Sequence, residues 1–441
     1  MSAKCAGVGK SAGMSDLKMQ IEDFGRRARA AARVLARTGR AQKDRGLLAM
    51  ADEIVAAAPE ILPANARDVE KAKANGLSGA MLDRLTLTEK RLGEMADGIR
   101  AVAGLPDPVG EILRDWTRPN GLRSQKVRVP IGVVGIIYES RPNVTSDAAV
   151  LCTKTGNATI LRGGSESIHS NVAIAAALSR GAARAGLPAD SVLLIPTTDR
   201  EAVRHLCEMD KYLDVIVPRG GKGLIETVVE HARMPVIKHY DGICIMYVDR
   251  DADLAMAESI VINAKCQRPG VCNAIETVLV HRDVAEQFFA TTGRALLIKG
   301  VELRCDERAF AMLNAERETP NPQRIGRATG QDFRTEFLDL ILAVKVVDSA
   351  DEAIAHIEEN GSHHSDGIVT ANAETAERFL GEVDSATVYW NASTRFTDGG
   401  EFGFGAEIGI STDKLHARGP MALEELTTYK YVLRGNGQIR T

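Results

Sequence analysis

Hydrophobic residues recur three and four positions apart from Ser15 to Leu105, which is the spacing of amphipathic helices. Breaks in this pattern fall at Gly39, Pro63, Gly76 and Pro106. Because glycine and proline end helices, the pattern predicts a series of separate helices. Residues 1–14 are small and polar without this spacing, and we expect them to form a disordered N-terminal extension.

The pattern changes between Trp116 and Pro130, where two extended stretches flank Arg118-Pro119-Asn120-Gly121-Leu122. Such a turn between extended stretches predicts a β-hairpin. Residues Tyr429 to Arg434 alternate between apolar and polar side chains, which predicts one further strand near the end of the chain.

From Ile131 to His239, short apolar runs alternate with segments of helical spacing. The predicted strands are 133–138, 159–161, 192–195 and 215–217, and the predicted helices are 147–154, 167–185, 200–208 and 223–232. This alternation is typical of an α/β fold whose parallel sheet binds a dinucleotide at its carboxyl edge.

Two glycine clusters follow strands of this predicted sheet: Arg162-Gly163-Gly164-Ser165 and Pro218-Arg219-Gly220-Gly221-Lys222-Gly223. Neither has the spacing G-x-G-x-x-G, and a Gly-Gly pair alone is most often only a turn. The second cluster opens a helix, so the amides around Gly220 and Gly221 suit a pyrophosphate.

Composition narrows the class of protein. The 441 residues are enough for two or three domains, and 44% hydrophobic with 26% charged residues is ordinary for a globular protein. A net charge of -4 with interspersed signs argues against nucleic-acid binding. No apolar run reaches the length of a membrane span, and seven cysteines without a close pair suggest reduced thiols, so we expect a cytoplasmic protein.

The most informative segment is Arg268-Pro269-Gly270-Val271-Cys272-Asn273-Ala274. It places a thiol in a turn between a helix predicted over 252–265 and a strand predicted over 275–280. A cysteine there suits a nucleophile whose backbone amide stabilises the oxyanion it generates. Taken alone, a cysteine is more often a packed apolar residue. Six others compete, at positions 5, 152, 207, 244, 266 and 305.

Further segments favour a nucleophilic role for Cys272 over a packed apolar residue. An apolar strand leads into a Pro-Asn turn at Pro142-Asn143, and Gly156 to Arg162 forms a Gly-Asn-x-hydrophobic-basic run. With the cysteine segment, these resemble the aldehyde dehydrogenase superfamily. Residues 131–165, 263–277 and 347–366 look more narrowly like the gamma-glutamyl phosphate reductase family, and the resemblance covers nearly the whole chain.

The resemblance implies an α/β aldehyde-dehydrogenase-like fold. Its parts are an NADP-binding domain over 15–109 and 131–238, a catalytic domain over 239–410, and a β-hairpin oligomerisation arm over 110–130 and 425–441. It also implies roles for three residues: Cys272 as nucleophile, Asn143 as oxyanion donor, and Glu336 as the group that holds the nicotinamide ribose.

The same resemblance bears on the cofactor, because Arg162, Gly163, Gly164 and Ser165 would lie along it. Family members that prefer NAD tend to carry Glu three residues after the basic residue, where this chain has Ser165. No carboxylate at that position would repel a 2′-phosphate, and Arg162 would attract one, so NADPH is expected. The alternative is that Glu166 rotates into the same place.

Hydrolytic relatives carry a water-activating Glu about thirty residues before the nucleophile, and His239 stands at the matching position here. This departure fits a thioester that exchanges with phosphate instead of water. Asp241 is an alternative base, and a structural role for His239 is equally open.

Cations are required for an anionic substrate, and Arg141, Arg268 and Arg395 are candidates, each equally able to form a structural ion pair. His363 and His364 suggest a metal, but the reaction needs none, and neighbours on one strand face opposite sides, so no metal site is expected.

The resemblance thus implies reduction of L-glutamyl 5-phosphate to L-glutamate 5-semialdehyde through a cysteine thioester, a step of proline biosynthesis. The expected partners are the substrate, further copies of the chain and a glutamate 5-kinase. Two alternatives stay open: another acyl-phosphate or acyl-CoA reductase of this fold, and an inactive relative that acts as a scaffold.

Overall fold

The computed structural model describes residues 8–77, 79–139, 141–315 and 319–440, which form two compact units. Unit 1 contains the chain up to Lys238 together with segments 403–409 and 421–440. Unit 2 contains residues 239–402 and 410–420. No helix in the described ranges is both long and apolar enough to cross a membrane.

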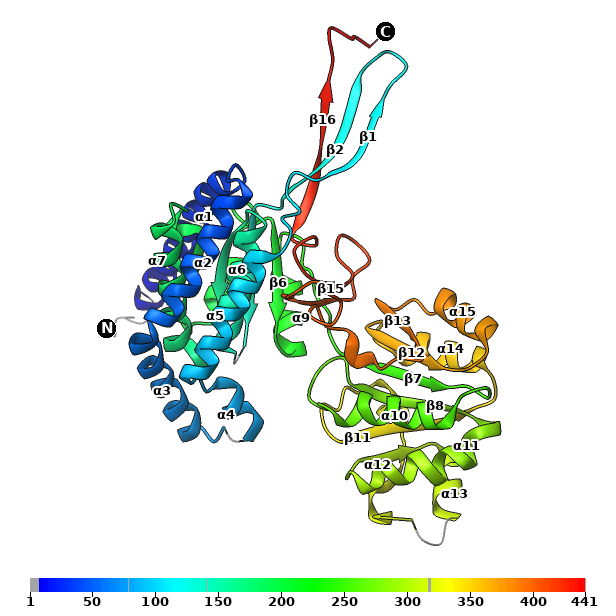
Figure 1. Ribbon diagram of the computed structural model, residues 1–441. Helices are drawn as coiled ribbons and strands as arrows, with labels where there is room; N and C mark the ends of the chain where they lie inside the picture. Colours follow the sequence, from blue (N-terminus) through cyan, green and yellow to red (C-terminus); the bar gives the residue numbers. More distant parts are fainter. Residues whose placement is uncertain (1–7, 78, 140, 316–318, 441) are drawn as a thin grey trace, which may run out of the picture. The chain divides into compact units, whose positions relative to one another are not determined.

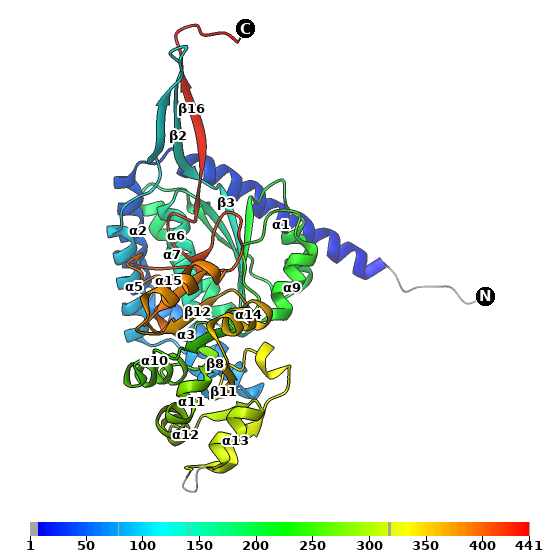
Figure 2. The same cartoon turned by 90° about the vertical axis from the view of Figure 1, so that its right-hand side faces the viewer.

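Helices come first in unit 1, as predicted. They are α1 (Val8–Leu35), α2 (Arg40–Ala56), α3 (Ala58–Ala74), α4 (Gly79–Leu85) and α5 (Glu89–Gly104). Figure 2 shows α1 as one long helix.

Two details of this region differ from the prediction. Residues 8–14 are helical rather than disordered, because a helix gains one hydrogen bond for each residue added to an existing end. Residues 1–7 lie outside the described part of the chain. Pro63 lies inside α3 instead of ending it, and the buried Ile61 and Ala64 beside it hold the helix by packing.

The predicted parallel sheet of unit 1 is confirmed. Its strand order is β5 (Val192–Leu194), β4 (Ala158–Arg162), β3 (Val133–Tyr138) and β6 (Val215–Arg219), all parallel. The accompanying helices are α6 (Pro142–Lys154), α7 (Ile168–Arg184), α8 (Glu201–Cys207) and α9 (Lys222–His231). Helix α6 begins earlier than predicted, since a proline is well suited to a first helical position, and Asn143 therefore lies in its first turn.

The predicted hairpin is confirmed by β1 (Ile112–Thr117) and β2 (Arg123–Pro130), which pair antiparallel. In the turn between them Gly121 adopts a φ of 83°, which favours glycine. The predicted last strand, β16 (Thr427–Arg434), pairs antiparallel with β2 and completes a three-stranded sheet (Figure 1).

Unit 2 is built on a seven-stranded parallel sheet. Its order is β10 (Ile325–Arg327), β9 (Glu302–Cys305), β11 (Ile341–Val347), β8 (Ile275–His281), β7 (Cys244–Val248), β12 (Ser365–Val369) and β13 (Thr387–Trp390). The helices are α10 (Leu254–Cys266), α11 (Arg282–Phe288), α12 (Arg294–Ile298), α13 (Glu307–Ala315), α14 (Ala350–Asn360) and α15 (Ala373–Glu382). Two short strands, β14 (Gly409–Ser411) and β15 (Gly419–Met421), form a separate pair.

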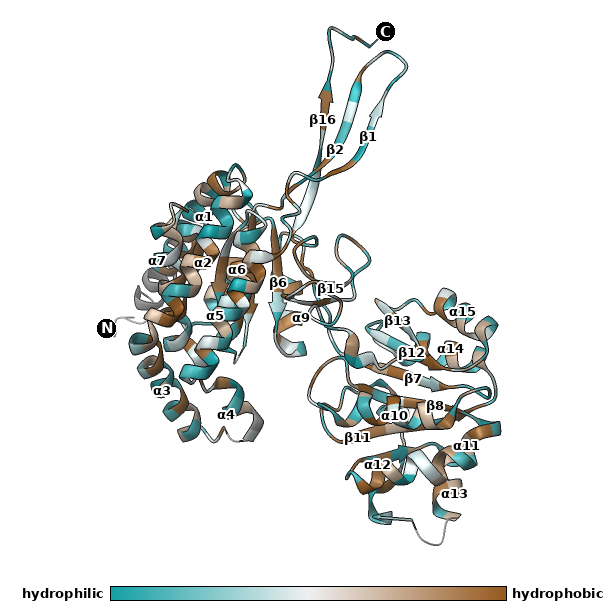
Figure 3. Ribbon diagram, viewed as in Figure 1, coloured by the Kyte–Doolittle hydropathy of each residue, from teal (hydrophilic) through white to brown (hydrophobic). Residues whose placement is uncertain are grey.

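The central strands of unit 2 are rich in apolar residues because helices cover a parallel sheet on both faces, although β8 also buries Glu276, Thr277 and His281. Every residue of β7 and β8 is buried. Figure 3 shows hydrophobic colours along β8, whereas the helices carry hydrophilic and hydrophobic residues side by side. The loop that contains Cys272 joins the carboxyl end of α10 to the start of β8.

Candidate active site

Cys272 lies in a tight turn between α10 and β8, as the sequence predicted. The amide of Ala274 donates to the carbonyl of Val271 over 3.0 Å, so the turn is closed around Cys272 and Asn273. The thiol is half-buried. The closed turn holds the thiol in place, and its partial exposure leaves it accessible to a small substrate.

The other described cysteines lie in environments that disfavour the thiolate. Cys152, Cys207, Cys244 and Cys305 are buried, and burial raises the pKa of each thiol, to about 12 for Cys152, Cys207 and Cys305. Cys266 is half-buried, and desolvation raises the pKa of its thiol as well. Since the thiolate is the reacting form, these environments favour Cys272 as the nucleophile. Cys5 lies outside the described residues.

Neighbouring segments fix the position of the cysteine turn. An ideal Cβ at Gly242 would lie 2.1 Å from the carbonyl oxygen of Cys272, so only glycine permits this approach. On the other side, the Asn273 amide donates to the carbonyl of Thr397 over 2.9 Å, and the Thr394 hydroxyl donates to the carbonyl of Asn273 over 2.7 Å.

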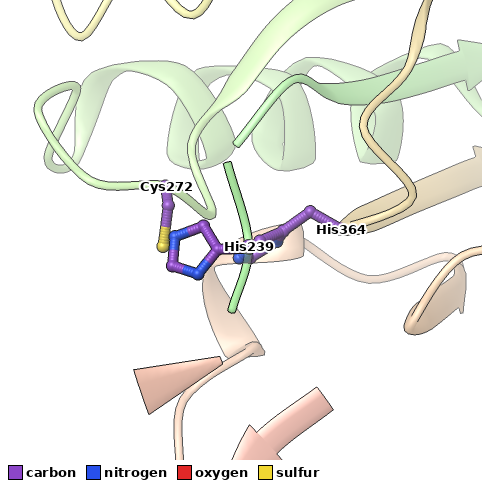
Figure 4. A group of neighbouring side chains, drawn as sticks. All are labelled: His239, Cys272 and His364. Carbon is purple, nitrogen blue, oxygen red and sulfur yellow. The ribbon is translucent and has the colours of Figure 1, made fainter. Parts of the chain in front are cut away.

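Two histidines gather around the thiol (Figure 4). One ligand atom from each of His239, Cys272 and His364 lies within 4.8 Å of the other two. Nδ1 of His239 is 2.8 Å from the carbonyl oxygen of Ile410. The two imidazole rings meet edge to face with centroids 5.4 Å apart.

The sequence did not predict that His364 belongs to this group. His363 and His364 precede β12 instead of lying on it, and His363 adopts a left-handed φ of 57°. Nδ1 of His363 is 2.9 Å from the carbonyl of Asp384, while His364 is fully buried beside Cys272. The prediction that rested on opposite faces of one strand was therefore wrong in its geometry.

A chain of hydroxyl groups supports His364. Its Nδ1 is 2.9 Å from Ser365 Oγ, which is 2.7 Å from Thr397 Oγ1, which is in turn 2.7 Å from the Tyr389 hydroxyl. These buried partners fix the plane of the imidazole ring.

Glu336 lies at the same loop cluster. Burial raises the pKa of its carboxyl to about 7, while a hydrogen bond from the Gly242 amide acts in the opposite direction. Gly242 is the residue packed against Cys272, so the carboxyl of Glu336 and Cys272 are separated by one backbone segment.

A small polar pocket of about 210 Å³ adjoins the cysteine turn. It is lined by Asn263, Gln267, Arg395, Phe396, Asp398 and Glu401. The Arg395 guanidinium donates to Gln267 over 2.8 Å and to the side-chain oxygen of Asn273. Burial first, and then repulsion from Arg268, lowers the pKa of Arg395. The pocket therefore offers a cation, two carboxylates and two amides.

A second cleft, of about 350 Å³, lies in unit 1 at the carboxyl ends of the strands. Of the residues predicted for the cofactor, Arg162, Gly164 and Ser165 line it. The predicted Gly163, Gly220 and Gly221 do not line it. Glu166, the alternative considered for the ribose, and Gly223 of the second glycine cluster do line it. The remaining lining residues were not predicted: Glu139, Thr198, Arg200, Val203, Leu224 and Thr227. Arg200 was the detectable omission, because it follows the predicted strand 192–195 and begins the next predicted helix.

The buried guanidinium of Arg162 is held by the carbonyls of Gly163, Thr198 and Asp199 at 3.1–3.3 Å. Burial lowers the pKa of Arg162, and Glu166 opposes that effect. One carboxylate oxygen of Glu166 is buried without a hydrogen-bond partner among the described residues. The cleft thus presents both a cation and an unsatisfied acceptor.

The start of α9 differs from expectation. The amide of Gly221, predicted to bind pyrophosphate, donates to the carboxylate of Glu139 over 2.9 Å. An ideal Cβ at Gly220 would lie 2.5 Å from the same carboxylate oxygen. Glu139 thus occupies the positive end of the helix, where a carboxylate is favourable.

Arg141 and Asn143 are in unit 1, whereas Cys272, Arg268 and Arg395 are in unit 2. Arg141 is the residue that precedes α6. The Asn143 amide donates to Asp147 over 2.9 Å, and burial raises the pKa of Asp147 to about 6. Since an amide nitrogen carries two hydrogens, Asn143 keeps a second donor.

Comparison with known proteins agrees with this arrangement. The model of the aldehyde dehydrogenase family matches residues 14–298. The chain is 57% identical over 425 residues to gamma-glutamyl phosphate reductase of Moorella thermoacetica, covering 96% of this chain and 100% of the relative. It is 56% identical to that of Opitutus terrae, covering 97% and 100%. The crystal structure of gamma-glutamyl phosphate reductase from Thermotoga maritima superposes with a TM-score of 0.92 at 45% identity, covering 96% of this chain and 100% of that chain.

Proposed function

The chain belongs to the aldehyde dehydrogenase family, among the gamma-glutamyl phosphate reductases, and on this premise we propose that it reduces L-glutamyl 5-phosphate to L-glutamate 5-semialdehyde with NADPH. As an oxidoreductase of this kind it serves proline biosynthesis. The observation that carries the mechanism is the half-buried Cys272 in its fixed turn, beside His239 and His364.

In the first half-reaction the Cys272 thiolate attacks the γ-carbonyl carbon of the acyl phosphate. A carbon–sulfur bond forms while the carbonyl oxygen becomes an oxyanion, held by the amide of Cys272 and by Asn143. The carbon–oxygen bond to phosphate then breaks, which leaves a thioester.

When bound, NADPH would supply the hydride that reduces this thioester. The unit 1 cleft fits such a cofactor, because Arg162 and Arg200 can attract a 2′-phosphate and the unsatisfied carboxylate of Glu166 can accept from a ribose hydroxyl. The space beside Gly163 and Gly220 is filled by protein side chains, since an ideal Cβ would lie 2.1 Å from Asn171 Nδ2 at Gly163 and 2.5 Å from Glu139 Oε2 at Gly220. Glu336 is proposed to hold the nicotinamide ribose. Finally the Cys272 sulfur leaves as thiolate and releases the aldehyde.

The polar pocket beside Cys272 is proposed to hold the amino-acid end of the substrate. Arg395, with Arg268 nearby, would bind the α-carboxylate, and Asp398 and Glu401 would bind the α-ammonium group. Arg141 remains a candidate for the phosphate. A pocket that carries both charge signs suits a zwitterion better than a simple aldehyde.

The proposed reaction can be tested through its dependence on phosphate, because His239 stands where hydrolytic relatives carry a water-activating Glu. Enzyme mixed with NADP and glutamate semialdehyde should form NADPH steadily only when phosphate or arsenate is present, because water lacks a well-placed carboxylate base. Without phosphate we expect a single-turnover burst. Steady NADPH formation without phosphate, with release of free glutamate, would contradict the proposal and assign a base role to Asp241 or another group.

The three-stranded sheet of β1, β2 and β16 is proposed to join copies of the chain. Its outer strands expose Ile112, Tyr429, Tyr431 and Leu433, each about half accessible. Apolar side chains on open strand edges are typical of sheets that pair with another chain.

A further inference from the structure

We propose that His239, Cys272 and His364 form a binding site for Zn²⁺, and that a bound ion blocks the nucleophile. The inference goes beyond the proposed reduction, which uses no metal. It rests on the only group of three metal-ligating side chains found among the described residues. Figure 4 shows the Cys272 sulfur next to the His239 ring, with His364 close behind.

The donor set matches the preferences of zinc. Zinc prefers thiolate and imidazole ligands, and three protein ligands with water in the fourth position make up many zinc sites. With Zn–S near 2.3 Å and Zn–N near 2.0 Å, ligand atoms of a tetrahedral site lie roughly 3.3 to 3.7 Å apart. The ligand atoms here lie within 4.8 Å of one another. Side-chain rotations that bring them about 1 Å closer together would complete a tetrahedral site.

Both imidazoles already have the partners that metal-binding histidines require. The carbonyl of Ile410 can only accept, so Nδ1 of His239 carries a proton and Nε2 has the lone pair in the neutral ring. Nδ1 of His364 is fixed by Ser365, Thr397 and Tyr389. The outer shell of a zinc site is thus present before an ion arrives.

The backbone that carries Cys272 is held in place on two sides. Gly242 contacts it on one side, and Asn273 ties the turn to Thr394 and Thr397 on the other. Coordination would occupy the sulfur lone pair that attacks the substrate and would displace the thiol proton to solvent. Zinc and acyl phosphate therefore compete for one atom.

The direct test measures binding without substrate. Chelator-treated full-length enzyme is titrated with Co²⁺, which should give one equivalent of a thiolate-to-cobalt charge-transfer band that Zn²⁺ abolishes. Cys272→Ser should remove the band, whereas Cys266→Ser, a matched thiol outside the group, should keep it. His239→Asn and His364→Gln should each weaken Zn²⁺ binding by at least about tenfold, since even outer-shell losses cost 10–100-fold.

A second measurement tests the block itself. Stoichiometric Zn²⁺ should slow iodoacetamide alkylation of Cys272, followed by mass spectrometry, and excess chelator should restore it. His364 is buried, and its replacement can prevent folding. If His364→Gln does not fold, Zn²⁺ binding to His239→Asn is the test, because His239 is only half-buried. A cobalt–thiolate band that survives in Cys272→Ser, full Zn²⁺ affinity in His239→Asn, or unchanged alkylation would overturn the proposal. Because neither readout needs turnover, failure here is separate from failure of the proposed reduction.

Discussion

The cofactor cleft of unit 1 and the cysteine site of unit 2 are assembled from different kinds of segment. The cleft is formed by loops that follow consecutive strands, and two of its charged groups are already bonded, Arg162 to three carbonyls and Glu139 to Gly221. The cysteine site joins residues 239, 272 and 364, which come from three distant parts of the chain.

This contrast predicts different responses to substitution. Several groups of the cleft are proposed to contact the cofactor. The loss of one should therefore change the preference for NADP over NAD more than it changes kcat. In the proposed mechanism a single sulfur of the cysteine site forms the covalent bond, so its loss should abolish turnover. The substitutions below test that difference, beginning with the largest expected effect.

Cys272→Ala should lower kcat by at least about 10⁴-fold, in line with losses of a covalent nucleophile in other enzymes. Cys266→Ser is the matched control and should keep most activity, because Cys266 lies at the end of α10, outside the group of three. Steady-state assays with circular dichroism to verify folding would measure both. Equal activity in the two variants would remove Cys272 from the mechanism.

Asn143→Ala should lower kcat by about 10² to 10³, the usual cost of one oxyanion donor. Asp147→Asn retains an oxygen that can accept from Asn143, so it should have a much smaller effect. Single-turnover measurements of thioester formation would separate the chemical step from cofactor release. A wild-type rate in Asn143→Ala would place the oxyanion donor elsewhere.

Two substitutions in the cleft should move cofactor preference in opposite directions. Ser165→Glu adds a carboxylate and should shift the ratio of kcat/KM for NADP over NAD downward by about five- to tenfold. Glu166→Gln removes one near Arg162 and should shift the ratio upward by a similar factor. A wild-type enzyme that prefers NAD outright would contradict the assignment of Arg162.

The smallest effect concerns pH. Burial raises the pKa of Glu336 to about 7, so its carboxyl is ionised only above that pH. If the ionised form holds the nicotinamide ribose, KM for NADP should rise a few-fold as pH falls from 8 to 6. Glu336→Gln should remove this dependence, and a KM profile that is identical in both proteins would exclude the role.

Contiguous motifs were predictable, and dispersed contacts were not. The cysteine turn, the strands of unit 1, the hairpin and the existence of strand β16 follow from local periodicity and turn residues. That β16 joins the hairpin in one arm came from the family resemblance. The place of His364 depends on strand order, because β12 pairs with β7 and β7 pairs with β8. Glu139 was missed for the same reason: its contact with Gly221 joins the ends of two neighbouring strands, and no local pattern marks it.

The pairing of β2 with β16 also constrains the order of events during synthesis. Strand β2 is made before its partner β16, and the whole of 239–402 is translated between them. Unit 2 can therefore fold while unit 1 still lacks its final strand, and contacts of such long sequence separation form slowly. Until β16 is made, β2 exposes an unpaired edge, which makes the nascent chain prone to aggregation during that interval.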